Sequence, residues 1–175
     1  NCANLISVVL TSSALRPISI ITQNYYETMS DEERNQFKMA IIRGLMVDDF
    51  SVINSFAHCL ALIIFLEFTH DHSLMRNQIF TTFLFELIDK SPTEYAPIGA
   101  ISAITEIFRV LPPFHLTTKN TAFLKEMILN VVRRVLPNSD INPYTLLFKQ
   151  ECCKCLIESI KKGLITEDVC AINKA

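Results

Sequence analysis

The sequence contains only three glycines and no tryptophan among its 175 residues. Glycine supplies the positive φ of tight hairpin turns and of phosphate-cradling loops, so three glycines are too few for an all-β domain or a phosphate-binding loop. The hydrophobic fraction of 50% is too high for a disordered chain, and the glycine and proline content is too low for collagen or a flexible linker. The composition therefore predicts a folded domain with a sizeable core.

The sequence also lacks a large excess of positive or negative charge. Sixteen Lys and Arg residues against 18 Asp and Glu residues leave a net charge of -2, which disfavours binding to nucleic acid. The longest apolar stretch, residues 52–68, contains Asn54, His58 and Glu67. Because these side chains are costly in hydrocarbon, we expect a buried helix and no membrane span.

Features of secreted proteins are missing as well. The sequence has no Asn-x-Ser/Thr sequon, and its start lacks the successive basic, apolar and small-residue regions of a signal peptide. We expect the six cysteines to be reduced, because Cys152, Cys153 and Cys155 are too close together to pair well. The protein is therefore expected to be intracellular, cytoplasmic or nuclear. Since the first residue is Asn, we also expect a piece of a longer chain.

Helical periodicity dominates the sequence, and no segment requires a strand. Six central helices are predicted, at residues 31–46, 50–68, 73–89, 92–110, 119–136 and 144–163. A flanking helix pair within residues 1–29 and a tail at 164–175 bring the expected total to about eight helices. The positions expected to begin or end a helix are Ser30 with Glu33, Asp48 or Asp49, Pro92 and Gly163.

The central helices repeat in pairs. The first helices of the three pairs align Phe37, Ile79 and Phe123, which are 42 and 44 residues apart. The second helices align two further columns, which consist of Cys59, Ala103 and Cys155, and of Ile64, Phe108 and Ile160. A period of about 40 to 47 residues built from antiparallel helix pairs resembles the HEAT and armadillo repeat families.

This resemblance implies an all-α fold in which residues 1–175 form a single helical domain. The pairs 31–68, 73–110 and 119–163 would stack as an α-solenoid, as in large scaffolds such as importin-β-type transport receptors. Second helices commonly line the concave surface of such solenoids, which implies a non-enzymatic scaffold that binds a partner protein within a larger chain or complex. The side chains opposite the core columns would form the protein-binding stripe: Ser102, Glu106, Arg109, Lys154, Glu158, Lys161 and Lys162.

Motifs for catalysis or metal binding are not found. There is no nucleophile elbow, no His-Glu-x-x-His pair and no EF-hand loop. The candidate metal ligands are two histidines and three cysteines, and they lack the spacing of a structural zinc site. We therefore expect inert, buried thiols, no metal, no cofactor and no enzyme. These candidate ligands are His70, His72, Cys152, Cys153 and Cys155.

Two alternatives remain open from the sequence. The apolar helix at 52–68 is compatible with a compact Bcl-2-like globule that binds a partner helix in a groove, although the sequence has no Trp for that family's Asn-Trp-Gly-Arg signature. An enzyme with a Cys/His site assembled by the fold is the second alternative. It rests on unpaired histidines such as His58 and His115, neither of which has a nucleophile at a recognisable spacing.

Overall fold

The protein is described from a computed structural model, which is all-helical. The structure describes residues 26, 28–71, 74–110, 125, 128–129, 131–133, 142–163 and 165, without the side chains of 66–81. The helices with defined bounds are α3 (Asp31–Gly44), α4 (Phe50–Asp71), α5 (Leu74–Lys90), α6 (Ala96–Val110) and α8 (Pro143–Lys161).

The predicted all-α class is confirmed, because the described residues contain helices and no strand. Residues 125, 128–129 and 131–133 are also helical and fall within the helix predicted at 119–136. The total of about eight helices is not confirmed. Most of the predicted flanking pair and nearly all of the tail lie outside the described residues.

The start of α3 follows the predicted capping box. The Ser30 hydroxyl accepts a hydrogen bond from the Glu33 backbone N–H at 3.3 Å, and the Ser30 backbone N–H donates to Glu33 Oε2 at 2.8 Å. This reciprocal pair satisfies two amides that the helix leaves free. The acidic first turn, Asp31 to Glu33, also complements the positive end of the helix dipole.

Side-chain caps also fix the starts of α4 and α8. Asp49, rather than Asp48, caps α4, because its Oδ1 accepts from the backbone N–H of Ser51 at 2.9 Å and of Val52 at 3.2 Å. Asn142 caps α8 in the same way, and Pro143 follows at the first helical position. At the other end of α8, Gly163 has a φ of +71°, which confirms its predicted role in ending the helix.

The prediction that Pro92 begins the fourth helix is wrong. Ser91 has a φ of +42°, so the chain turns sharply there, and residues 92–95 form bends and turns before α6 starts at Ala96. The helix begins where a capping group is present: the Thr93 hydroxyl accepts from the Ala96 backbone N–H at 3.1 Å. The cap, rather than the proline, therefore sets the boundary.

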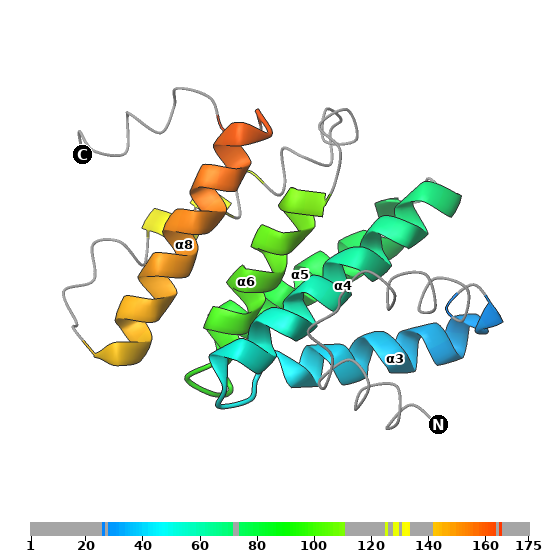
Figure 1. Cartoon of the computed structure of the whole chain (residues 1–175), viewed down its shortest axis with the longest axis horizontal. Helices are drawn as coiled ribbons and strands as arrows, with labels where there is room; N and C mark the ends of the chain where they lie inside the picture. Colours follow the sequence, from blue (N-terminus) through cyan, green and yellow to red (C-terminus); the bar gives the residue numbers. More distant parts are fainter. Residues whose placement is uncertain are drawn as a thin grey trace.

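Helices α4, α6 and α8 lie side by side with α6 in the middle, whereas α5 packs against α6 and α4, and α3 against α4 (Figure 1). Eleven of the 15 residues of α6 are buried. They include Ile101 and Ile104, which with Leu60 of α4 and Cys155 of α8 belong to one core cluster. Helix α6 is therefore enclosed by its neighbours on most of its circumference.

The aligned core columns are only partly correct. Ile64 and Phe108 are buried, at 3% and 1% exposed, but Ile160 in the same column is 50% exposed. Helix α8 stands at the end of the described row, so α6 covers one of its sides and no other helix with defined bounds covers the opposite side. The expectation that Ile160 is a core residue is wrong for this reason.

Two glycines allow close helix packing. A Cβ atom at Gly99 of α6 would overlap the backbone carbonyl group and the Cβ of Leu45, which follows α3. A Cβ at Gly44 would lie 2.5 Å from the ring of Phe56. The Gly99 contact is the stricter of the two, because a main-chain carbonyl cannot rotate away as a side chain can.

We expect Gly99→Ala to lower the free energy of unfolding by about 2 kcal/mol, since overpacking outweighs the roughly 1 kcal/mol by which alanine favours a helix over glycine. Urea unfolding followed by circular dichroism measures the change. Gly44→Ala is the matched comparison and should cost less, because the Phe56 ring can adjust. A Gly99→Ala variant as stable as the original chain would contradict this packing.

Candidate protein-binding face

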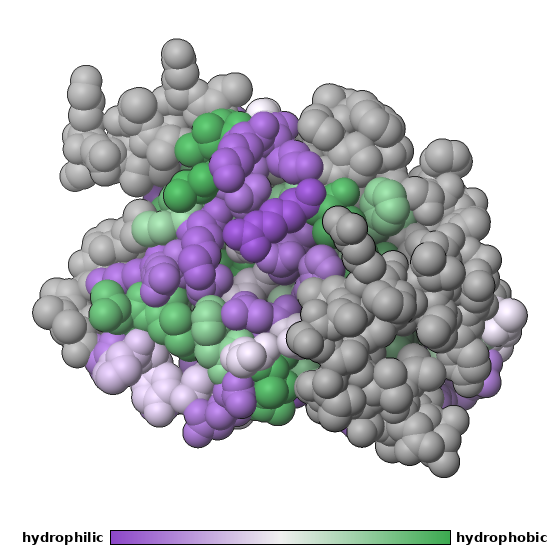
Figure 2. Space-filling model, in the orientation of Figure 1, coloured by the Kyte–Doolittle hydropathy of each residue, from purple (hydrophilic) through white to green (hydrophobic). Residues whose placement is uncertain are grey.

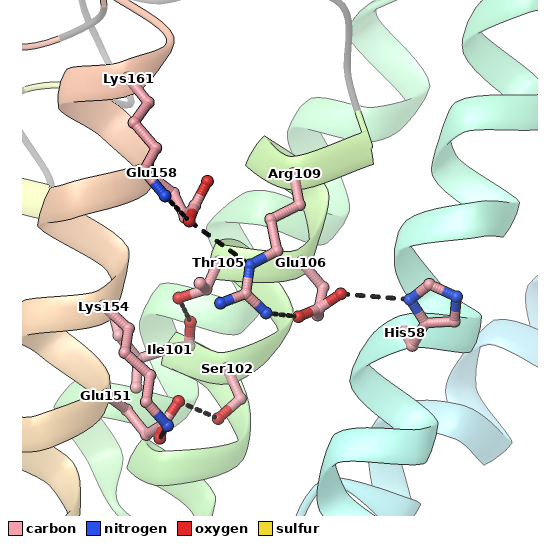
Figure 3. Close-up of polar contacts among 10 residues, drawn as sticks. All are labelled: His58, Ile101, Ser102, Thr105, Glu106, Arg109, Glu151, Lys154, Glu158 and Lys161. Atoms are coloured by element: carbon pink, nitrogen blue, oxygen red, sulfur yellow. Dashed lines mark hydrogen bonds and ion pairs between the residues drawn. The ribbon is translucent and has the colours of Figure 1, made fainter.

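The residues predicted to form a binding stripe come from two adjacent helices. Ser102, Glu106 and Arg109 lie on α6, and Lys154, Glu158 and Lys161 lie on α8, with Lys162 as its C-terminal cap. Repeats of three and four residues place each set along one side of its helix. The two sides meet where α6 packs against α8 (Figure 3).

Four of these residues form one chain of ion pairs. Arg109 pairs with Glu106 on its own helix, and its Nε lies 3.7 Å from Glu158 Oε1 across the helix boundary. Lys161 Nζ donates to the same Glu158 oxygen at 2.9 Å. Lys162 Nζ donates to the Arg109 backbone carbonyl at 3.2 Å, a second link between the end of α8 and α6.

Helix α4 joins this network through His58, which sequence reasoning left without a partner. His58 Nδ1 lies 3.1 Å from Glu106 Oε2, so the Glu106 carboxylate bridges α4 and Arg109 (Figure 3). The two residues are 48 positions apart. No local pattern in the sequence signals such a pair, because it forms only when the two helices pack together.

A second polar cluster lies nearer the start of α8. Ser102 Oγ donates to Glu151 Oε2 at 3.3 Å, and Lys154 Nζ donates to Glu151 Oε1 at 2.6 Å. Lys154 Nζ also lies 5.7 Å from the centre of the Phe50 ring, within cation–π range. Glu151, which the stripe prediction omitted, is thus a buried carboxylate neutralised by a lysine on its own helix.

One predicted site residue is not on the surface. Ser102 is only 3% exposed, because it faces α8 and its hydroxyl donates to Glu151. Ser102, which the sequence placed in the protein-binding stripe, is therefore not part of the exposed surface. From here on, "the α6–α8 face" denotes six charged residues: Glu106, Arg109, Glu151, Lys154, Glu158 and Lys161.

The network keeps two of the carboxylates ionised. The hydrogen bond from His58 lowers the pKa of Glu106 below its usual value, an effect that Arg109 reinforces and that burial opposes. The hydrogen bond from Lys161 likewise lowers the pKa of Glu158, again against the desolvation of that carboxyl. Both groups therefore carry negative charge at neutral pH and hold the cations in place.

Comparison of the chain with protein-family models, with curated proteins and with solved structures finds no match. The function is therefore inferred from the residues and geometry of this chain alone.

Two cysteines are shielded from water and a third is partly so. Cys152 and Cys155 are fully buried, which confirms the burial predicted for these thiols, and Cys59 is partly buried. Burial raises the pKa of Cys59 to about 11 and that of Cys155 to about 12, and it raises the pKa of Cys152 as well. Cys153, in contrast, is exposed.

In the described part of the chain, no three His, Cys, Asp or Glu side chains converge as a metal site would require. The side chains of His70, His72 and His115 lie outside that part. Among the same residues, no helix combines the length and the apolar character needed to cross a membrane.

The low pKa of Glu106 predicts acid sensitivity. Because its pKa is lower in the folded chain than in the unfolded chain, its stabilisation is complete above about pH 4.5 and is lost as the pH falls through the folded-state value. Urea unfolding between pH 7 and pH 3.5 should therefore show a smaller loss of stability for Glu106→Gln than for the original chain. Glu86→Gln breaks the exposed pair with Lys90 and serves as the control. An unchanged acid slope in Glu106→Gln would contradict this role.

Burial predicts selective thiol chemistry. Because the thiolate is the nucleophile, iodoacetamide at pH 8 should alkylate Cys153 more than about tenfold faster than Cys152 or Cys155. Peptide mass spectrometry over a time course separates the three sites, and Cys153→Ser removes the fast reaction. Equal rates at all three positions would show that the α8 packing described above is incorrect.

Proposed function

We propose that the protein is a non-enzymatic, helical-repeat scaffold segment that binds a partner protein along the α6–α8 face. The observation that carries this proposal is the set of ion pairs that α6 and α8 present side by side. These side chains stand on rigid helices, which suits recognition of an extended partner surface better than enclosure of a small substrate.

The order of the helices supports a HEAT- or armadillo-like solenoid. Helices α4, α6 and α8 are the second members of the predicted pairs, and they form one row, while α3 and α5 each contact the second helix of their own pair. Repeats in a solenoid contact mainly their neighbours in this way.

The chemistry of the described residues also supports a binding role. The cysteines Cys59, Cys152 and Cys155 have raised pKa values and are poor nucleophiles, and His58 is engaged with Glu106. The Bcl-2-like alternative is not favoured, since α6, and not the helix at 52–68, packs most extensively against the other helices with defined bounds. The free thiols at these three positions and at Cys153 suit the cytoplasm or nucleus, where we place the protein.

Charge reversal tests the proposal. The double variant Arg109→Glu, Lys161→Glu should capture at least one partner protein from cell extract about tenfold less than the original chain, because charges at an interface govern partner selection. Quantitative mass spectrometry of the captured proteins gives the ratio. Lys90→Glu on α5 is the matched control, since Lys90 also pairs with a glutamate one turn away, and it should leave capture unchanged.

Thermal unfolding checks that each variant folds, and Arg109→Gln, Lys161→Gln replaces the double reversal where folding is impaired. If both folded α6–α8 variants capture the same proteins in the same amounts as the original chain, the proposed binding face is wrong.

A further inference from the structure

The α6–α8 face has three acidic and three basic residues, yet its exposed surface is mainly cationic. Its three carboxylates are recessed, with side-chain exposures of 4% for Glu151, 13% for Glu158 and 17% for Glu106. Its cations protrude, at 61% for Lys161, 45% for Arg109 and 38% for Lys154. A molecule that approaches this face therefore meets the positive groups first.

Helix geometry explains this separation. Each exposed cation follows its glutamate by three residues, as Lys154 follows Glu151 and Lys161 follows Glu158. Three residues advance an α-helix by about 300°, which places each lysine roughly 60° to one side of its glutamate. On α8 the glutamates turn toward α6 and the lysines lie on the outer side. The carboxylates already accept hydrogen bonds from protein groups, whereas each lysine ammonium has three donors and uses one of them in these hydrogen bonds.

A row of exposed apolar side chains borders the lysines on α8. Leu146, Ile157 and Ile160 are 61%, 51% and 50% exposed, and Cys153 lies in the same row. Their spacing puts them on the side of the lysines that faces away from α6. Figure 2 shows hydrophobic patches beside the hydrophilic band that runs over α8 and α6. The outer half of α8 thus carries an apolar row and a cationic row in parallel.

We infer that this surface binds an acidic, amphipathic helix of a partner protein, an inference that rests on the proposed function. Lys154 and Lys161 are seven residues apart, which is about 10 Å along the helix axis. Two carboxylates seven residues apart on the partner helix match that separation. Apolar side chains in the neighbouring row of the partner would cover Ile157 and Ile160, whose burial supplies affinity while the charges select the partner.

A protein helix fits this surface better than an anionic bilayer does. Membranes are recognised by dense clusters of roughly four to eight basic residues. On the α6–α8 face each exposed cation alternates with a carboxylate, and the apolar row lies to one side. Such an arrangement favours a ligand whose charges have a fixed spacing. A helical peptide has such a spacing, whereas a fluid lipid surface does not.

The test uses two synthetic helical peptides labelled with a fluorophore. One carries Glu at positions seven residues apart beside a row of Leu, and the other has Lys in place of each Glu. Fluorescence anisotropy with the full chain should give at least about tenfold tighter binding of the acidic peptide, with affinity that falls as salt rises. The variant Lys161→Glu, Ile157→Ser should weaken that binding about tenfold. It keeps Lys154, which neutralises buried Glu151, and Lys90→Glu is the control.

Equal or tighter binding of the basic peptide would overturn the inference, as would unchanged binding of the acidic peptide by Lys161→Glu, Ile157→Ser. Failure of both peptides to bind would also overturn the inference. The proposed function would still stand in that case if the double variant Arg109→Glu, Lys161→Glu loses partner capture. Sedimentation with phosphatidylserine vesicles tests whether the surface binds lipid instead. Vesicle binding that Lys161→Glu, Ile157→Ser abolishes and that the acidic peptide does not displace would assign the surface to lipid and overturn the inference.

Discussion

The close approach of α6 to the end of α3 is the constraint on which the other contacts depend. At Gly99 the α6 backbone lies directly against the carbonyl group of Leu45, and an added Cβ atom would overlap that group. Beyond that contact, α6 packs between α4 and α8, and eleven of its residues are buried. The positions of Glu106 and Arg109 relative to His58 and Glu158 follow from this seating, because all four side chains reach across helix boundaries set by α6.

The polar contacts contribute more to specificity than to stability. Exposed ion pairs are each worth about 0 to 1 kcal/mol, and a partly buried pair must first offset the loss of hydration. Their structural effect is to fix the register of α4, α6 and α8, since a shift of one turn would separate Glu106 from His58 and Glu151 from Ser102. They also pair the glutamate carboxylates with groups of the protein itself. A chain with a net charge of -2 thereby presents a locally cationic face.

Much of the fold could be predicted from local sequence signals. The Ser30 capping box and the Gly163 terminus satisfy backbone groups within a few residues, so the sequence alone locates them, and it restricts the cap of α4 to Asp48 or Asp49. The start of α6 was misplaced because a proline and a capping threonine lie one residue apart and both are plausible helix starts.

Features that depend on packing between helices could not be predicted in the same way. The candidate residues of α6 and α8 were found because helical spacing defines a side, yet spacing does not reveal how deeply that side is covered. Ser102 is therefore buried and Ile160 exposed, each against expectation. The His58–Glu106 pair and buried Glu151 depend on which helices are adjacent, and no periodicity within one helix contains that information.

Native-state hydrogen exchange tests the central claim, that α6 is the helix around which the others assemble. Amides in the buried part of α6, Ile101 to Phe108, should exchange only through global unfolding and be the slowest in the described residues. Amides of α3, which contacts only α4 among the major helix pairs, should exchange faster through local opening. Exchange in α6 as fast as in α3, at a rate insensitive to global stability, would contradict the account.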